Sequence, residues 1–232
     1  MKFGSKEKVR TFTSTSLSNK AVDNIKAMNN NELNTEQIIL IAAEAEFLEK
    51  GYSNAKMMSI AKRANVAHSM LHYYFRNKEN LFQTIFLTKA QTLFPMFEGV
   101  LDKQLPFPET VRILMETQFN FMLQNPKLPL FLLTEIFSNK VNRALLLEVI
   151  SGKVIPFFSK LKEMLDKEVK TGRVRPIQFQ DLVMNFTSIN ASTFLAFPIL
   201  QEIAGQTDES IEKRLIERRE SNVQFILSAL KP

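Results

Sequence analysis

The sequence of 232 residues contains no cysteine, no tryptophan and only six glycines. Without cysteine there can be no disulfide, no thiolate metal site and no thiol nucleophile. No stretch approaches the roughly 18 consecutive apolar residues of a transmembrane helix. The basic N-terminus lacks the apolar core of a secretory signal. These absences are compatible with a cytoplasmic protein that has no membrane partner.

The features that support catalysis are equally scarce. The glycines are scattered and form no phosphate-binding loop, and no serine lies in a nucleophile elbow. We therefore expect neither an enzyme nor a bound cofactor, although an all-α enzyme stays open as an alternative. No window alternates apolar and polar residues with period two, so the fold class is predicted to be all-α.

Positive charge is concentrated in one segment of the chain. The formal net charge is +6, and residues 50–78 contain six basic residues and no acidic one. Residues 83–232, with eighteen basic and sixteen acidic residues, are close to balance. Such a concentration suggests a polyanionic partner, although a solvated basic face would have the same composition.

Composition and periodicity divide the chain into three parts. Residues 1–33 are rich in Ser, Thr, Asn and Lys and are predicted to form a flexible extension. A domain of residues 34–82 begins with a helix that Asn34 and Gln37 start as a capping box and Gly51 ends. One face of this helix is predicted to carry its apolar residues, Ile38, Ile41, Ala42, Ala45 and Leu48. Residues 83–232 form a larger domain of further helices.

Two short helical patterns, at residues 56–64 and 67–74, follow with only a tight turn between them. Together with the preceding helix they predict a three-helix, helix-turn-helix domain. The apolar residues that its packing needs are all present: Ile60, Ala61, Ala64, Val66, Leu71 and Phe75. The outward positions of the second short helix are Ala67, His68, Ser69, Met70, His72 and Tyr73. These mostly small or hydrogen-bonding residues suit base edges and phosphates in a major groove.

The two histidines of the chain, His68 and His72, have the spacing of a zinc-binding helix. A metal needs at least one further ligand, and residues 50–78 supply no cysteine, no third histidine and no acidic residue. We therefore predict no metal site. Contact with DNA is the preferred interpretation, ahead of a structural role for the pair.

The stretch "TEQIILIAAEAEFLEKGYSNAKMMSIAKRANVAHSMLHYYFRNKENLF" resembles the DNA-binding domain of the TetR family of bacterial transcriptional repressors. The matching features are "AA…F…GY", "IAKRA-V" and "L-YYF-NKE-LF", in the family's order and spacing. The resemblance implies a homodimer that binds a double-stranded DNA operator and is released by a small-molecule effector. It also implies that Tyr73 faces the phosphates and Tyr74 packs in the core. His72 stands where the family commonly has a tyrosine.

Basic residues of the same segment are expected to contact phosphates. Lys56 and Lys78 complete the predicted DNA-binding set, and Lys62, Arg63 and Arg76 are expected to add to a salt-dependent attraction. A nonspecific architectural DNA-binding protein is the alternative. It would explain the basic segment but not the apolar C-terminal region.

The C-terminal domain holds fifteen of the twenty phenylalanines. With the resemblance, this content implies an apolar ligand pocket, although a core without a cavity would have the same composition. The candidate polar groups of the pocket are Gln118, Asn120, Thr134, Asn185 and Ser188. Dimerisation is predicted through helices at 178–204 and 208–230. The first has a strip of small residues, Ser188, Ala191, Ser192 and Ala196, and the second an apolar stripe, Ile211, Leu215, Val223, Ile226 and Leu230.

Overall fold

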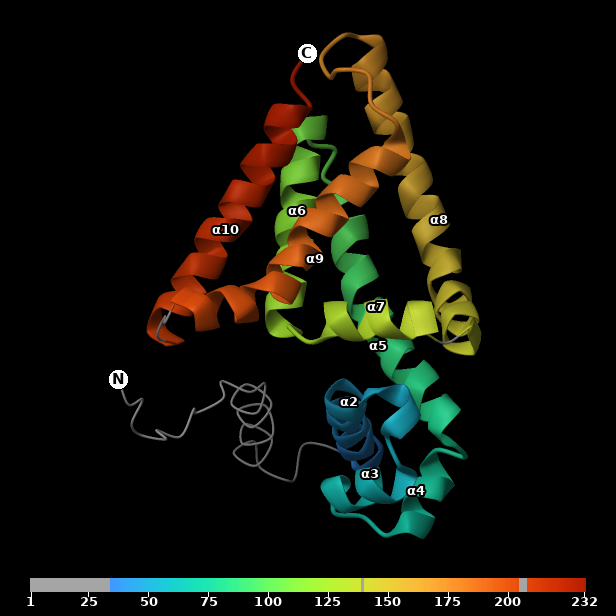
Figure 1. The fold of residues 1–232 in the computed structure, drawn as a ribbon. Helices are drawn as coiled ribbons and strands as arrows, with labels where there is room; N and C mark the ends of the chain where they lie inside the picture. The colour runs from blue at the N-terminus through green and yellow to red at the C-terminus, as the bar shows by residue number, and fades with distance from the viewer. Residues whose placement is uncertain (1–33, 139, 205–207) are drawn as a thin grey trace, which may run out of the picture. The chain divides into compact units, whose positions relative to one another are not determined.

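The computed structural model describes residues 34–138, 140–204 and 208–232, and the predicted extension, residues 1–33, lies outside them. Every regular element in the described ranges is an α-helix (Figure 1), which confirms the all-α prediction. The chain divides into two compact units, one ending at Lys78 and the other starting at Glu79. Within the described part, none of the helices has the length and apolar character needed to cross a membrane.

The first unit contains α2 (Thr35–Asn54), α3 (Met57–Ala64) and α4 (His68–Tyr74). Asn34 starts α2 as predicted, because its side chain accepts a hydrogen bond from the Gln37 amide (2.9 Å) and the Gln37 side chain accepts one from the Asn34 amide (3.0 Å). These two bonds satisfy amides that the first turn of a helix leaves without partners. Gly51 interrupts the helix with a φ of 73°, which glycine adopts without strain.

The buried face of α2 differs from the predicted one. The residues buried there are Ile39, Ala42, Ala43, Glu46 and Phe47. The predicted face is shifted from the buried one by about one residue, and the buried one includes a glutamate, which apolar spacing does not predict. Glu46 is only 1% exposed, and its carboxylate lies 2.6 Å from Lys50 Nζ and 3.1 Å from Arg63 Nη2. Burial of a charge is tolerated when cations pair with it, as they do here.

The described part of the second unit consists of α5 (Lys78–Leu101), α6 (Phe107–Gln124), α7 (Leu128–Ser138), α8 (Lys140–Lys170), α9 (Phe179–Ala204) and α10 (Asp208–Ala229). In this unit α6, α9 and α10 pack against one another, and α7 packs against α8 and α9 (Figure 1). The main core draws on α5, α6, α8, α9 and α10 through side chains such as Phe97, Leu114, Leu161, Phe186 and Val223.

The apolar stripe of α10 belongs to the interior of its own unit. Four of its five predicted members, Leu215, Val223, Ile226 and Leu230, are buried there, and the side chain of the fifth, Ile211, lies outside the described part of the structure. The expectation that this stripe forms a dimer interface was therefore wrong, because an amphipathic helix at the surface of a bundle turns its apolar stripe towards its own core.

A buried polar junction joins α6, α9 and α10. The Asn190 amide donates to the Met115 carbonyl and to Gln118 Oε1, both at 3.0 Å. The Asn222 amide donates to Asn190 Oδ1 and to Thr193 Oγ1, both at 3.2 Å. Asn190 and Asn222 are almost fully buried, so each bond replaces one that water can no longer supply. Apolar periodicity gives no indication of this junction.

We expect Glu46→Gln to lower the free energy of unfolding of the first unit by about 2 kcal/mol, because it leaves two cations beside a buried neutral amide. Glu49→Gln is the matched control. Glu49 bridges the same Arg63 at 2.6 Å but is half exposed, so its loss should cost less than about 1 kcal/mol. Denaturant unfolding followed by circular dichroism measures both, and equal losses would contradict the structural role of Glu46.

Candidate nucleic-acid interface

The turn between α3 and α4 is fixed by the end of α3. Asn65 has φ 55° and ψ 41°, and its amide donates to the Lys62 carbonyl at 3.2 Å. The Val66 amide donates to the Ala61 carbonyl at 3.0 Å. This pair of bonds is the Schellman arrangement, which needs a left-handed residue and most often uses glycine. Asparagine tolerates that conformation, so the chain makes the sharp turn without a glycine.

The inner side of the two short helices is buried as the sequence predicted. The residues that hold them together are Ile60, Ala61, Ala64, Leu71 and Phe75, each 6% exposed or less. Val66 in the turn is half-buried. Since α4 is attached by Leu71 and Phe75, its remaining side chains are directed outward.

All six predicted outward residues are exposed: Ala67, His68, Ser69, Met70, His72 and Tyr73. Among the described residues of the unit, Tyr73 is the most exposed large hydrophobic side chain, at 85%. Tyr74 is also exposed, at 41%, and its ring lies edge-on to that of Tyr73 with 5.3 Å between the centroids. The expectation that Tyr74 packs in the core was wrong. Phe75 takes that buried place, so α4 presents two adjacent tyrosines at its surface.

The two histidines form a contact on this face. Their ring centroids lie 4.5 Å apart, with the rings nearly perpendicular. Nδ1 of His72 lies 3.2 Å from the carbonyl oxygen of Arg76. Among the described residues, no group of three or more His, Cys, Asp or Glu side chains is placed to hold a metal ion.

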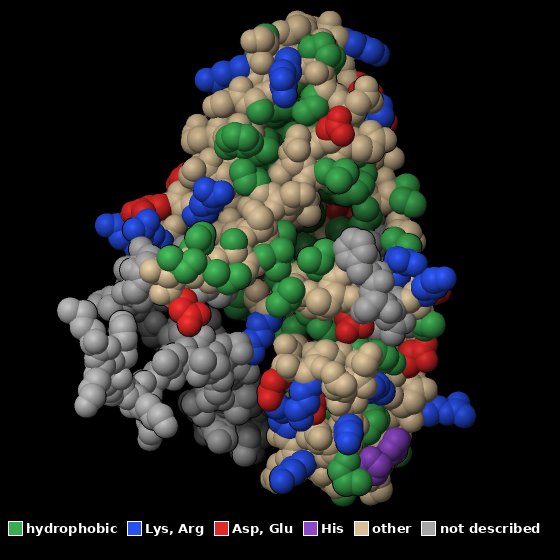
Figure 2. Space-filling model, viewed as in Figure 1, with side chains coloured by type: hydrophobic (Ala, Val, Ile, Leu, Met, Phe, Trp, Pro, Cys, Tyr) green, Lys and Arg blue, Asp and Glu red, His purple; other side chains and the backbone are tan. Residues whose placement is uncertain are grey.

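The cations of the basic segment divide into two groups. Lys50 and Arg63 are paired with Glu46, and Arg63 also with Glu49. By contrast, Lys56, Lys62 and Arg76 are exposed and make no ion pair within the described part of the chain. Figure 2 shows basic side chains close to the histidines on the visible face of this unit. The charge available to a polyanion is therefore smaller than the sequence count.

Lys78 has a structural role that sequence reasoning missed. Its ammonium donates to the carbonyl oxygens of Tyr52 (2.8 Å), Ala55 (3.0 Å) and Ser53 (3.3 Å), and it lies 4.6 Å from the centre of the Tyr52 ring. These carbonyls follow the interruption of α2 at Gly51, where helical acceptors lose their partners. An ammonium has three hydrogens, so a phosphate at Lys78 would compete with three existing acceptors. Its contact with DNA stays a prediction.

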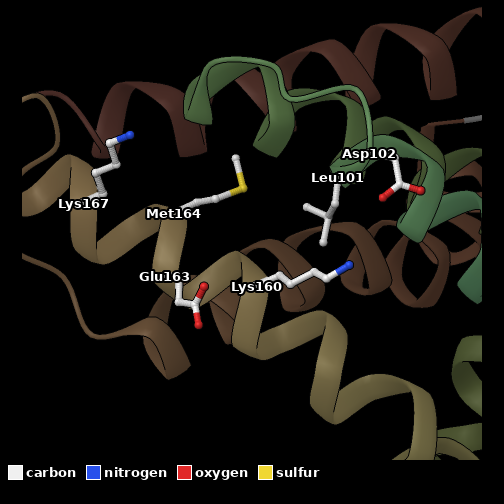
Figure 3. A pocket seen from close by; sticks show the side chains of 6 residues that line it. All are labelled: Leu101, Asp102, Lys160, Glu163, Met164 and Lys167. Atoms are coloured by element: carbon white, nitrogen blue, oxygen red, sulfur yellow. The ribbon is translucent and has the colours of Figure 1, made fainter.

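The structure separates the five candidate pocket residues. Gln118 is buried in the polar junction, whereas Asn120, Thr134, Asn185 and Ser188 are exposed. None of them lines the open depression of about 310 Å³ shown in Figure 3. That depression is lined by Leu101, Asp102, Lys160, Glu163, Met164 and Lys167. Its four charged side chains do not match the apolar pocket that the sequence predicted.

Comparison with known proteins gives concordant matches. Residues 39–85 match the family described as bacterial regulatory proteins, tetR family. An HTH-type transcriptional regulator of Bacillus subtilis, YhgD, is 27% identical over 146 residues, which are 62% of this chain and 74% of that protein. Among solved structures, a mutant of HlyIIR is 25% identical with a TM-score of 0.63, covering 85% of this chain and 97% of its own. The regulator FadR from Bacillus subtilis, solved with stearoyl-CoA, is 19% identical with a TM-score of 0.64, covering 83% and 98%.

Lys78→Met keeps the aliphatic stem but removes the ammonium, and we expect it to lower the free energy of unfolding of the first unit by about 2 kcal/mol. The cause is the loss of three hydrogen bonds and the contact with Tyr52. Lys62→Met is the control and should change stability by less than about 0.5 kcal/mol, as is usual for an exposed side chain. Denaturant unfolding compares the two variants, and equal stabilities would show that the Lys78 bonds contribute nothing.

Proposed function

We propose that this chain, which belongs to the tetR family of bacterial regulatory proteins, represses transcription from a DNA operator that α4 binds. The protein releases this operator when a small ligand binds its C-terminal helices. The observation that carries the proposal is the two-sided construction of α4. Leu71 and Phe75 are buried on one side, and His68, His72 and Tyr73 are exposed on the other. A short helix attached in this way can enter a major groove with its outer side chains directed at the bases.

The unpaired cations support the same orientation. Lys56 precedes α3, Lys62 lies in its last turn, and Arg76 follows α4. They therefore border the recognition helix, where phosphates would lie on both sides of the groove. Arg63 is expected to contribute less than the sequence suggested, because two carboxylates already neutralise it.

The exposed residues of α9 support dimerisation through this helix. The strip of small residues includes Ser188, Ser192 and Ala196, all exposed, and Ala191, which is half-buried. Large apolar side chains of the same helix are exposed as well: Met184, Ile199, Leu200 and Ile203. On α10, Ile216 and Phe225 are exposed apart from the buried stripe. A second copy of the chain would cover these residues and place two recognition helices about 34–36 Å apart or somewhat more.

The proposed ligand is small and largely apolar. The phenylalanine content of the second unit supports this class, and so does the FadR structure in complex with stearoyl-CoA, since FadR has the same fold. A molecule with an acyl chain is the ligand class that these observations favour. Gln118 is the one buried member of the candidate polar set, so it is the group that we propose for its recognition.

Selection of bound sites from random double-stranded DNA tests the proposed function. We expect a two-fold symmetric motif, because a dimer presents the same helix twice. Enrichment without any motif would instead indicate a nonspecific architectural DNA-binding protein.

On the selected site, Lys56→Met and Arg76→Met should each reduce the slope of log affinity against log salt by about 0.9. Lys103→Met, at an exposed position of the second unit, should leave that slope unchanged. Unchanged slopes for both variants would show that Lys56 and Arg76 do not contact DNA phosphates.

Ala196→Arg should give monomers that lose operator binding, because the arginine would bury an unpaired charge between two copies of α9. Ser159→Arg is the control, since Ser159 is an exposed small residue on α8. Sedimentation velocity at micromolar concentration measures the association state. A monomeric wild type, or a dimeric Ala196→Arg, would contradict the proposed interface.

A further inference from the structure

His72 occupies a fixed position on the outer side of α4. The neighbouring Leu71 is completely buried, so the helix cannot rotate about its axis without exposing that side chain. The His68 ring lies one turn earlier, and its perpendicular contact at 4.5 Å restricts the rotation of the His72 ring. Its position therefore depends on both the backbone and a neighbouring ring.

The hydrogen bond of His72 determines its tautomer. Nδ1 lies 3.2 Å from the Arg76 carbonyl oxygen. A carbonyl oxygen can only accept, so Nδ1 must carry the hydrogen. In a neutral imidazole the other nitrogen, Nε2, then carries a lone pair and can only accept. Within the described residues Nε2 makes no hydrogen bond, so this acceptor is available to a partner.

In the major groove an acceptor discriminates among bases. Adenine N6 and cytosine N4 present donors there, whereas guanine O6 and N7 and thymine O4 present acceptors. We propose that His72 accepts, through Nε2, a hydrogen bond from the amino group of an adenine or cytosine, and so determines the base preferred at one position of each half-site. This inference rests on the proposed function, since it takes α4 as the helix in the groove.

The tautomer can be measured without DNA. The chain has only two histidines, so ring-¹⁵N labelling of histidine in the full-length protein gives two ring systems in a long-range ¹H–¹⁵N spectrum. His68→Gln assigns the remaining one. At pH 8, where an ordinary imidazole is neutral, we expect His72 to be protonated at Nδ1, the form that unstructured peptides disfavour. Protonation at Nε2 would overturn the inference.

The base preference is tested by selecting sites from random DNA at pH 8 with the wild type, His72→Glu and His72→Lys. Glutamate only accepts, so it should keep the preferred adenine or cytosine while binding more weakly overall. Lysine only donates, so it should change the preference at that position to guanine by about tenfold. The same motif from all three proteins would contradict the proposal.

Failure of the proposed function and failure of the His72 proposal give different results. If the wild type selects no motif, the proposed function fails, and the tautomer measurement still stands by itself. If the wild type selects a motif and the His72→Lys motif is identical to it, the repressor function stands and His72 does not determine the base.

Discussion

A helix as short as α4 does not persist in water by itself, because so few residues cannot offset the cost of the first helical turn. The seven residues from His68 to Tyr74 are helical because Leu71 and Phe75 are buried against the rest of the first unit. One side of the helix is therefore needed for packing, and the other side is free to contact a partner. A partner on the outer side of α4 meets side chains that do not hold the helix in place, so those side chains can differ without loss of the scaffold.

The same separation applies to charge. Six cations lie between residues 50 and 78, but Lys50, Arg63 and Lys78 are bonded to groups of their own unit. Two of these neutralise a buried carboxylate, and the third binds carbonyl oxygens near the interruption of α2. Within the described residues Lys56, Lys62 and Arg76 remain exposed without an ion pair. The number of cations in a sequence is an upper limit on the positive charge that a partner can contact. Carboxylates and carbonyl oxygens within the fold bind some of these cations and so reduce that charge.

Local rules predicted the parts of the structure that local chemistry decides. The capping box at Asn34 and the bounds of α3 and α4 depend on neighbours within a few residues, and each was predicted closely. Contacts made by distant residues were missed. Glu46 is buried because Arg63, seventeen residues later, reaches it. For the candidate site, apolar spacing identified the outward face of α4, whereas the family resemblance misplaced Tyr74.

The polar junction at Asn190 and Asn222 bears on how the second unit can move. Apolar side chains can slide past one another with little change in energy, whereas directional hydrogen bonds in a dry interior fix one register. Three helices, α6, α9 and α10, are connected through this junction, and α7 and α8 take no part in its bonds. The three connected helices should therefore behave as one rigid body. Any change of shape within the described part of this unit would then fall to α5, α7 and α8, which could shift without breaking a bond of the junction.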